Sequence, residues 1–188
     1  GGNGSVAVRG AAGGGGEPGV AWMLAPVAAD ERELLLRLFE LYLHDMSELE
    51  PADVDEAGRF LPPARPWVAQ FWTEPGWEAL LLRAGGKPAG FALVADRSPI
   101  AGAEDRRSVA AFFVARAYRG RGLGTAMARE LFRRAPGRWL VLEIRANTGA
   151  QAFWRRIIGA ATGGGFAERW VSEREVVQEF VVPAEGER

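Results

Sequence analysis

The 188-residue sequence contains no cysteine and only one histidine, His44. Without cysteine there can be no disulfide, no thiolate metal ligand and no thiol nucleophile. A single histidine also leaves too few nitrogen ligands for a typical zinc site, so we expect no metal. A group-transfer reaction on this chain therefore cannot pass through a cysteine-bound intermediate.

The sequence has neither a surplus of one charge nor a long apolar run. Lys and Arg together number 23 and Asp and Glu number 24, which gives a net charge of −1. Proteins that bind nucleic acid backbones usually carry a basic surplus, so we expect no nucleic acid partner. No apolar stretch approaches the length of a membrane span, and no basic-then-apolar leader pattern is present. We therefore expect a cytoplasmic protein with no membrane partner.

Hydrophobic residues make up 48% of the chain, which is enough for the core of one domain. Residues 1–19 are rich in Gly and Ala, so we predict a disordered tail there and a single domain over 20–183. Hydrophobic periodicity within that domain predicts strands and helices in a definite order. The predicted strands are 20–28, 78–84, 89–96, 109–114 and 139–144, followed by two closing strands within 162–182. The predicted helices are 30–47, 67–72, 125–135 and 148–158.

The most informative segment is 118–124, YRGRGLG, which lies between a predicted strand and a predicted helix. Glycines at 120, 122 and 124 let backbone N–H groups approach an anion with no Cβ in the way. The helix that we expect to begin near Thr125 directs its unpaired N–H groups to the same place. Arg119 and Arg121 add forked donors suited to phosphate oxygens. This order of elements predicts a phosphate-binding loop.

The spacing of this loop distinguishes between the known phosphate loops. A P-loop requires Gly-Lys-Ser/Thr, and the only lysine of the chain is Lys87. A dinucleotide loop requires G-x-G-x-x-G, but the third position is Thr125 counted from Gly120 and Met127 counted from Gly122. The pattern that does fit is R-x-x-G-x-G, formed by Arg119, Gly122 and Gly124.

Two motifs together resemble the GNAT superfamily of N-acetyltransferases. The first is the R-x-x-G-x-G loop, preceded here by Phe112-Phe113-Val114. The second is N-x-x-A-x-x-F-W after the next strand, formed here by Asn147, Ala150, Phe153 and Trp154. The order and spacing of these motifs are similar to that superfamily over residues 78–182, and LYLHDMSEL (41–49) is similar to the helix end of one of its subgroups.

The resemblance implies an α/β fold. We expect a GNAT-like mixed, mostly antiparallel sheet of about seven strands, flanked by about four helices and splayed between strands 4 and 5. It also implies acetyl-CoA as co-substrate, with its pyrophosphate on the loop and its pantetheine arm paired with strand backbone near Phe113 and Val114. The cofactor-binding residues implied in this way are Phe113, Val114, Arg119, Gly120, Arg121, Gly122, Leu123, Gly124, Thr125 and Asn147. Asn147 is equally suited to cap the helix that follows it.

The chain departs from the resemblance at both usual proton-handling positions. Relatives carry Glu before Phe-Phe-Val, where this chain has Ala111, and a Tyr acid where this chain has Trp154. Glu143 on the following strand and His44 at the end of the first helix are the substitute candidates for catalysis. A salt bridge for Glu143 and a surface position for His44 are the structural alternatives.

We therefore expect an acetyl-CoA-dependent N-acetyltransferase that acts by direct transfer to a primary amine in a ternary complex. The acceptor stays open between a small molecule and a peptide, and a homodimer is left open as the assembly. The alternative from another class is an acyl-CoA-binding module with little turnover, and a generic nucleotide-phosphate domain is a third hypothesis. The acidic residues of 45–56 favour a cationic acceptor.

Overall fold

The computed structural model describes residues 8–12 and 19–184. These residues form two compact units. The first unit holds the described residues up to Leu93 together with Ala111–Gly124, and the second holds Val94–Ala110 and the residues from Thr125 onward. The two units interleave along the sequence, so no single cut in the chain separates them. The single domain over 20–183 stays a prediction.

The strands of the first unit are neighbours in the order β1-β2-β3-β4-β5. Their bounds are Val8–Ala12 for β1, Val20–Pro26 for β2, Glu78–Ala84 for β3, Lys87–Ala95 for β4 and Arg107–Val114 for β5. The pairings of β1 with β2 and of β2 with β3 are both antiparallel. Strands β3 and β4 form the predicted hairpin, since Gly85 and Gly86 both take positive φ at the turn that joins them.

Strand β1 corrects the prediction of a disordered tail over 1–19. Val8–Ala12 pairs with β2 from Val8↔Leu24 to Ala12↔Val20. A Cβ on Gly10 would lie 2.6 Å from the Trp22 indole, so the ring packs closely over the strand at this glycine. Backbone pairing to the edge of β2 needs no large side chains, which is why composition did not reveal it. Residues 1–7 and 13–18 lie outside the described residues.

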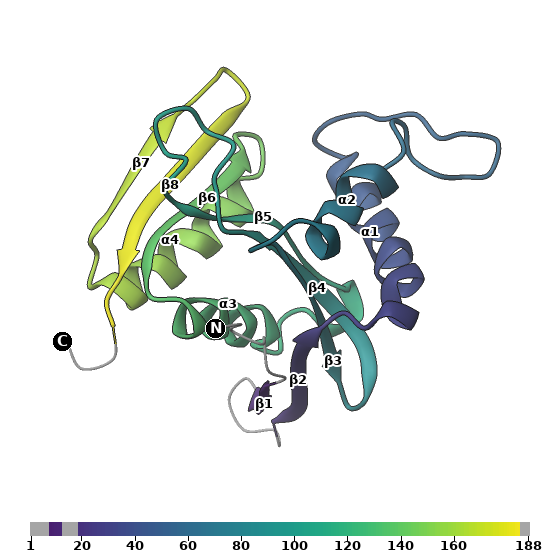
Figure 1. Ribbon diagram of the computed structural model, residues 1–188, viewed down its shortest axis with the longest axis horizontal. Helices are drawn as coiled ribbons and strands as arrows, with labels where there is room; N and C mark the ends of the chain where they lie inside the picture. Colours follow the sequence, from purple (N-terminus) through teal and green to yellow (C-terminus); the bar gives the residue numbers. More distant parts are fainter. Residues whose placement is uncertain (1–7, 13–18, 185–188) are drawn as a thin grey trace. The chain divides into compact units, whose positions relative to one another are not determined.

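Helices α1 (Arg32–Met46) and α2 (Arg65–Thr73) lie side by side in the first unit (Figure 1). A short 3-10 turn, η1 (Ala29–Glu31), precedes α1, and a second one, η2 (Arg116–Tyr118), follows β5. A cluster of aromatic rings joins the helices to the strands. The centre of the Phe39 ring of α1 lies 5.6 Å from that of Trp67 in α2 and 5.7 Å from that of Phe91 in β4. Two tryptophans near α2 contact the ring of Phe71 in that helix, with ring-centroid distances of 5.0 Å for Trp67 and 4.9 Å for Trp77.

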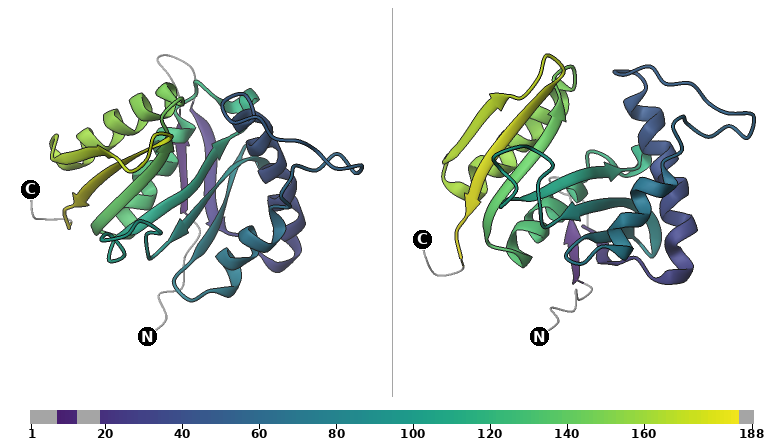
Figure 2. Two further views of the ribbon diagram at one scale, coloured as in Figure 1. Left: turned by 90° about the horizontal axis from the view of Figure 1, so that it is seen from above. Right: turned by 45° about the horizontal axis from the view of Figure 1, so that its top comes forward.

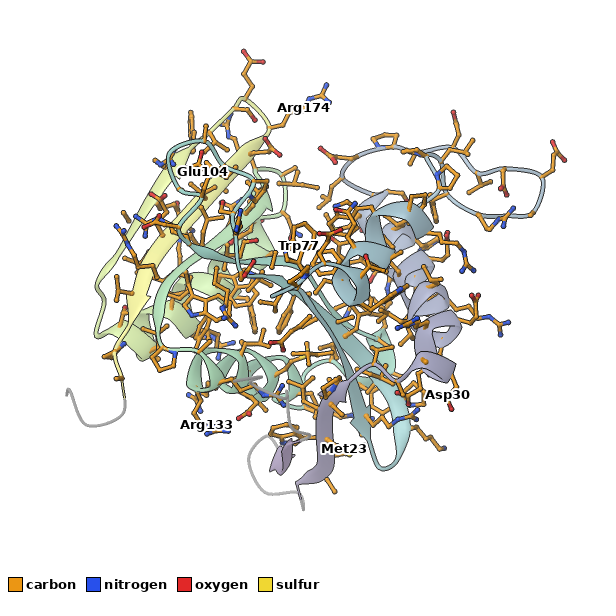
Figure 3. The ribbon with its side chains drawn as sticks, viewed as in Figure 1. Met23, Asp30, Trp77, Glu104, Arg133 and Arg174 are labelled. Atoms are coloured by element: carbon orange, nitrogen blue, oxygen red, sulfur yellow. The ribbon has the colours of Figure 1, made fainter. Side chains whose placement is uncertain are left out.

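In the second unit the strand order is β5-β6-β8-β7. The remaining elements are α3 (Leu123–Arg134), β6 (Gly137–Ile144), α4 (Thr148–Thr162), β7 (Phe166–Trp170) and β8 (Glu175–Val182). Strand β8 pairs antiparallel with both β6 and β7, and α4 packs along β8 (Figure 2). Arg133 on α3 and Arg174 in the β7–β8 turn point outward from this unit (Figure 3).

The two faces of the second unit's sheet are covered differently. Phe132 of α3 contacts Trp139 of β6 at 5.3 Å and Phe180 of β8 at 5.0 Å, so this face lies under the helices. Leu140 and Val177 lie on the other face and pack against Ala103 of the loop before β5. Strand alternation therefore places the odd-numbered residues of β6, from Trp139 to Glu143, on the helix face.

The predicted fold class is confirmed: the described residues form a mixed α/β fold with a mostly antiparallel sheet, and four α-helices lie among them. The seven predicted strands correspond to β2 to β8, and β1 is an addition. The parallel ladder of β5 with β6 covers only three residue pairs, from Arg107↔Trp139 to Val109↔Val141, as a splay between these strands requires. Among residues 8–12 and 19–184, no helix has the length and apolar character needed to cross a membrane.

Candidate functional site

The predicted phosphate loop, residues 119–124, follows η2 and leads directly into α3. Gly120 and Gly122 have φ of 74° and 77°, a left-handed conformation that side chains with a Cβ rarely adopt. Residues 119–122 are all exposed, whereas Leu123 is 1% exposed and anchors the start of the helix. Because α3 begins at Leu123, two residues before the predicted start, Gly124 and Thr125 lie in its first turn, where backbone N–H groups have no partner within the helix.

The end of β5 fixes the direction of the peptide groups that precede this loop. The Ala115 N–H donates to the Ala89 carbonyl of β4 at 2.8 Å, and a Cβ on Gly90 would lie 2.1 Å from the Phe113 carbonyl oxygen. The backbone groups of Phe113 and Ala115 therefore face β4. By strand alternation, the N–H and C=O of Val114 face away from β4.

Of the two predicted pantetheine partners, Val114 therefore has the backbone direction that pairing with a ligand requires. The backbone carbonyl of Phe113 faces β4 instead, and its side chain is buried. The Phe113 ring packs 5.5 Å from Phe91 and 6.4 Å from Tyr42 of α1. Phe113 thus supports the strand end from within the core of the first unit.

The two arginines of the phosphate loop have different surroundings. The Arg119 Nε donates to the Val114 carbonyl at 2.7 Å, and its Nη2 binds the Asp45 carboxylate in the last turn of α1. The guanidinium of Arg121 lies 6.0 Å from the centre of the Tyr118 ring. Both side chains are exposed, so their outer edges are open to an anionic ligand.

Asp45 also binds Arg116 of η2, through its Oδ1 at 3.0 Å to Nε and 2.8 Å to Nη2. Burial alone would raise the pKa of Asp45, but the hydrogen bonds from Arg119 and Arg116 outweigh it and hold the pKa below its ordinary value. The predicted candidate His44 precedes Asp45 on α1 and is exposed, and its carbonyl accepts from the Ser47 hydroxyl at 2.7 Å. His44 is thus the sequence neighbour of Asp45, and it lies on the surface.

Glu143, the other predicted catalytic residue, is buried on the helix face of the second unit and is 7% exposed. Both of its carboxyl oxygens are buried without a hydrogen-bond partner. Burial, followed by the nearby carboxylate Glu168 of β7, raises the pKa of Glu143 to about 8, and Arg155 of α4 lowers it only partly. The alternative of a salt bridge is therefore not realised: Arg155 forms its bidentate ion pair with Glu168 at 2.8 and 2.7 Å.

The remaining predicted residues of the second unit have structural positions in or beside α4. Asn147 is the N-cap of α4, because its side-chain oxygen accepts from the Ala150 N–H at 3.0 Å. Trp154 is 4% exposed and packs 6.3 Å from Phe132, as a core residue does. In the part of the chain that the structure describes, no group of three or more His, Asp or Glu residues is arranged to hold a metal ion.

The sequence did not reveal the ion pair between Asp45 and Arg116. Asp45 lies 71 residues before Arg116 and 74 before Arg119, and no periodic pattern connects positions so far apart. The only local signal is that Arg116 and Arg119 are three residues apart across η2, where that spacing places side chains on one side of a turn.

The model of the Acetyltransferase (GNAT) family matches residues 35–160. A comparison with curated proteins gave no match.

Solved structures extend the similarity to nearly the whole chain. An acetyltransferase from Thermus thermophilus is 21% identical, with a TM-score of 0.64 over 86% of this chain and 97% of its own. A GNAT-family acetyltransferase from Listeria monocytogenes is 16% identical, with a TM-score of 0.62 over 93% and 100%. A ribosomal-protein-alanine N-acetyltransferase from Brucella melitensis is 18% identical, with a TM-score of 0.58 over 85% and 99%. Because the family model spans most of the chain and includes the phosphate loop, we conclude that the chain belongs to the GNAT acetyltransferase family.

Proposed function

We propose that this chain transfers an acetyl group from acetyl-CoA to a primary amine, by direct attack in a ternary complex. In this reaction the amine nitrogen forms a bond to the acetyl carbon, the carbon–sulfur bond breaks, the amine loses a proton and the thiolate gains one. The absence of cysteine supports direct transfer, because no thiol is available to carry the acetyl group.

The conformation of the phosphate loop is the observation that carries this proposal. The positive φ of Gly120 and Gly122 exposes backbone N–H groups ahead of the first turn of α3, where an anion is favoured. Arg119 and Arg121 add cationic donors beside it. These residues fit a pyrophosphate, and we propose that they hold the nucleotide end of acetyl-CoA.

The thioester end is proposed to meet Val114. Its N–H faces away from β4, and the flanking peptide groups are fixed against β4 by Ala89 and Gly90. A rigid N–H in this direction suits the developing charge on a thioester oxygen, since a fixed donor needs no reorganisation during the reaction.

Proton transfer relies on few side chains. Ala111 and Trp154 occupy the two positions at which the resemblance implied proton-handling groups, and neither side chain titrates. Glu143, with a pKa of about 8, is mainly protonated at neutral pH. It can therefore act as a base only as the pH rises through about 8, and below that it is suited to give a proton. His44 remains the second candidate base.

For the acceptor we propose a cationic amine. Within the acidic stretch, Asp45 and Asp55 are neutralised by arginines, while the other four acidic side chains are exposed: Glu48, Glu50, Asp53 and Glu56. An exposed acidic surface concentrates positively charged ligands. The name of the Brucella melitensis relative, a ribosomal-protein-alanine N-acetyltransferase, supports including peptide amines among the acceptors to be tested.

A calorimetric titration with acetyl-CoA, followed by a thiol-release assay with a panel of amines, tests the proposal. We expect binding, and thiol release that is faster with cationic amines. Gly122→Val is expected to weaken acetyl-CoA binding at least about 100-fold, because a branched residue is strained at a φ of 77° and its side chain obstructs the anion. Circular dichroism should show that this variant still folds, since Gly122 is exposed. Unchanged acetyl-CoA affinity in the folded variant would exclude the loop as the binding site.

A second candidate is an acyl-CoA-binding module with little turnover. It is favoured by the burial of Trp154 in the core and by the apolar Ala111. The same experiment separates the two functions, because a module binds acetyl-CoA but releases no thiol with any amine, including at a pH above the pKa of about 8 of Glu143. Tighter binding of ATP or NAD than of acetyl-CoA would instead indicate a general nucleotide-phosphate domain.

A further inference from the structure

Asp45 occupies an unfavourable position for an isolated carboxylate. It lies in the last turn of α1, one residue before the C-terminal Met46, where the helix dipole repels negative charge. Its two oxygens divide between two arginines: Oδ1 binds Arg116 at 2.8 Å, and Oδ2 binds Arg119. The placement of Asp45 is therefore explained by these arginines and not by the helix itself.

Burial distinguishes the acid from its partners. The Asp45 side chain is 19% exposed, whereas those of Arg116 and Arg119 are 67% and 46% exposed. The carboxylate lies on the inner side of the pair, and the guanidinium groups extend outward from it. Single exposed ion pairs contribute little to stability, but one carboxylate that holds two guanidinium groups restricts the direction of both.

The restriction extends from Arg119 to the end of β5. The Arg119 Nε donates to the Val114 carbonyl at 2.7 Å, and its guanidinium lies 5.7 Å from the centre of the Phe113 ring. The peptide group between Val114 and Ala115 is thus held on both sides, by Arg119 at its oxygen and by the Ala89 carbonyl at its N–H. A chain of contacts leads from α1 through Asp45 and Arg119 to the strand end.

We infer that Asp45 is a positioning residue, which holds Arg116 and Arg119 so that their outer edges converge on the phosphates of acetyl-CoA. This inference rests on the proposed function and assigns two further residues to it, Asp45 and Arg116. Asp45 acts through the arginines and does not itself touch the ligand. The opposite role would be competition, in which the carboxylate occupies the arginines and must be displaced by the phosphates.

The substitution Asp45→Asn separates these roles, because it keeps the shape of the side chain and removes its charge. Positioning predicts about tenfold weaker acetyl-CoA binding, as expected when the partner that orients a binding group is lost. Binding of acetyl-pantetheine, which has no pyrophosphate, should change less than about twofold, because the loss is confined to the phosphate contacts. A general structural defect would weaken both ligands alike and would overturn the inference.

Asp55→Asn is the matched control. Asp55 is another partly buried aspartate of the first unit in an ion pair with an arginine, Arg59, with 3.2 Å between Arg59 Nε and Asp55 Oδ2. This variant should bind acetyl-CoA like the wild type. Arg116→Ala provides a second variant on the exposed side of the cluster and should also weaken acetyl-CoA binding. The double variant with Asp45→Asn should lose less binding free energy than the sum of the two single losses, because both variants remove the contribution of Arg116.

The outcomes also separate this inference from the proposed function. If the wild type does not bind acetyl-CoA, the proposed function is wrong. If the wild type binds but Asp45→Asn binds equally well or more tightly, the proposed function stands and positioning by Asp45 is wrong. Tighter binding would identify Asp45 as a competitor of the phosphates.

Discussion

The substitution Gly90→Ala is expected to destabilise the protein by about 3 kcal/mol, the upper end of the usual cost of overpacking. A Cβ at this position would lie 2.1 Å from the Phe113 carbonyl oxygen and 3.1 Å from the Val114 Cα. The three nearest atoms all belong to the backbone of β5, so rotation of a side chain cannot relieve these contacts. Strands β4 and β5 must then move apart where Ala89 binds Ala115. Urea unfolding followed by circular dichroism measures this loss.

Gly159→Ala is the control for Gly90→Ala, with the opposite expected sign. Gly159 lies within α4, and a Cβ there would meet no atom within 4 Å other than the helix's own nearby backbone. Alanine in a helix interior is favoured over glycine by roughly 0.5–1 kcal/mol, so this variant should gain stability. If Gly90→Ala unfolds at the same urea concentration as the wild type, the close approach of β4 and β5 at this point is wrong.

The second large effect is expected from Glu143→Gln, which should stabilise the protein increasingly as the pH rises. In the folded state Glu143 keeps its proton up to a pKa of about 8, against 4.5 as the ordinary value. Between these two pH values Glu143 is ionised in the unfolded chain but protonated in the folded protein. The wild type therefore loses about 1.4 kcal/mol of stability for each unit by which the pH rises. Glutamine does not titrate, and its advantage should reach about 3 kcal/mol at neutral pH and vanish in acid.

Glu130→Gln provides a control in which the sign is reversed. Glu130 of α3 is as buried as Glu143, but it forms ion pairs with Arg133 and Arg134, both at 2.9 Å. Burial would raise its pKa, and the hydrogen bonds from Arg133 and Arg134 outweigh burial and lower it. Its carboxylate therefore stabilises the folded state above the ordinary pKa and not in acid, so Glu130→Gln should be destabilising at neutral pH. The assignment of Glu143 as a protonated group would be contradicted if both variants changed the free energy of unfolding in the same direction at every pH.

Local patterns predicted the regular elements of this protein well. Apolar runs located β2 to β8 within a few residues, and glycines at 85 and 86 located the hairpin turn. The local conformation of residues 119–124 was also predictable, because glycines with positive φ lie between a strand and a helix; phosphate binding by these residues stays a prediction. These features depend on residues that are neighbours in the sequence.

The features that sequence analysis missed depend on residues that are far apart. Strand β1 pairs through its backbone, which leaves almost no trace in a stretch of small residues. The contact of Asp45 with Arg116 and the burial of Glu143 beneath α4 arise only when separate elements pack. The charge state of Glu143 follows from that packing, since the same residue on an exposed strand would ionise at its ordinary pKa.

The interleaving of the two units constrains how the chain can fold during synthesis. The first unit is incomplete when Leu93 has been made, because the end of β5 and the phosphate loop are supplied by Ala111–Gly124. The intervening residues Val94–Ala110 belong to the second unit, most of which is made later still. The first unit therefore cannot be completed before part of the second unit has been synthesised, unlike the first domain in a chain of separate domains. A nascent chain that ends before Arg107 exposes the edge of β4 to other partners until β5 is synthesised.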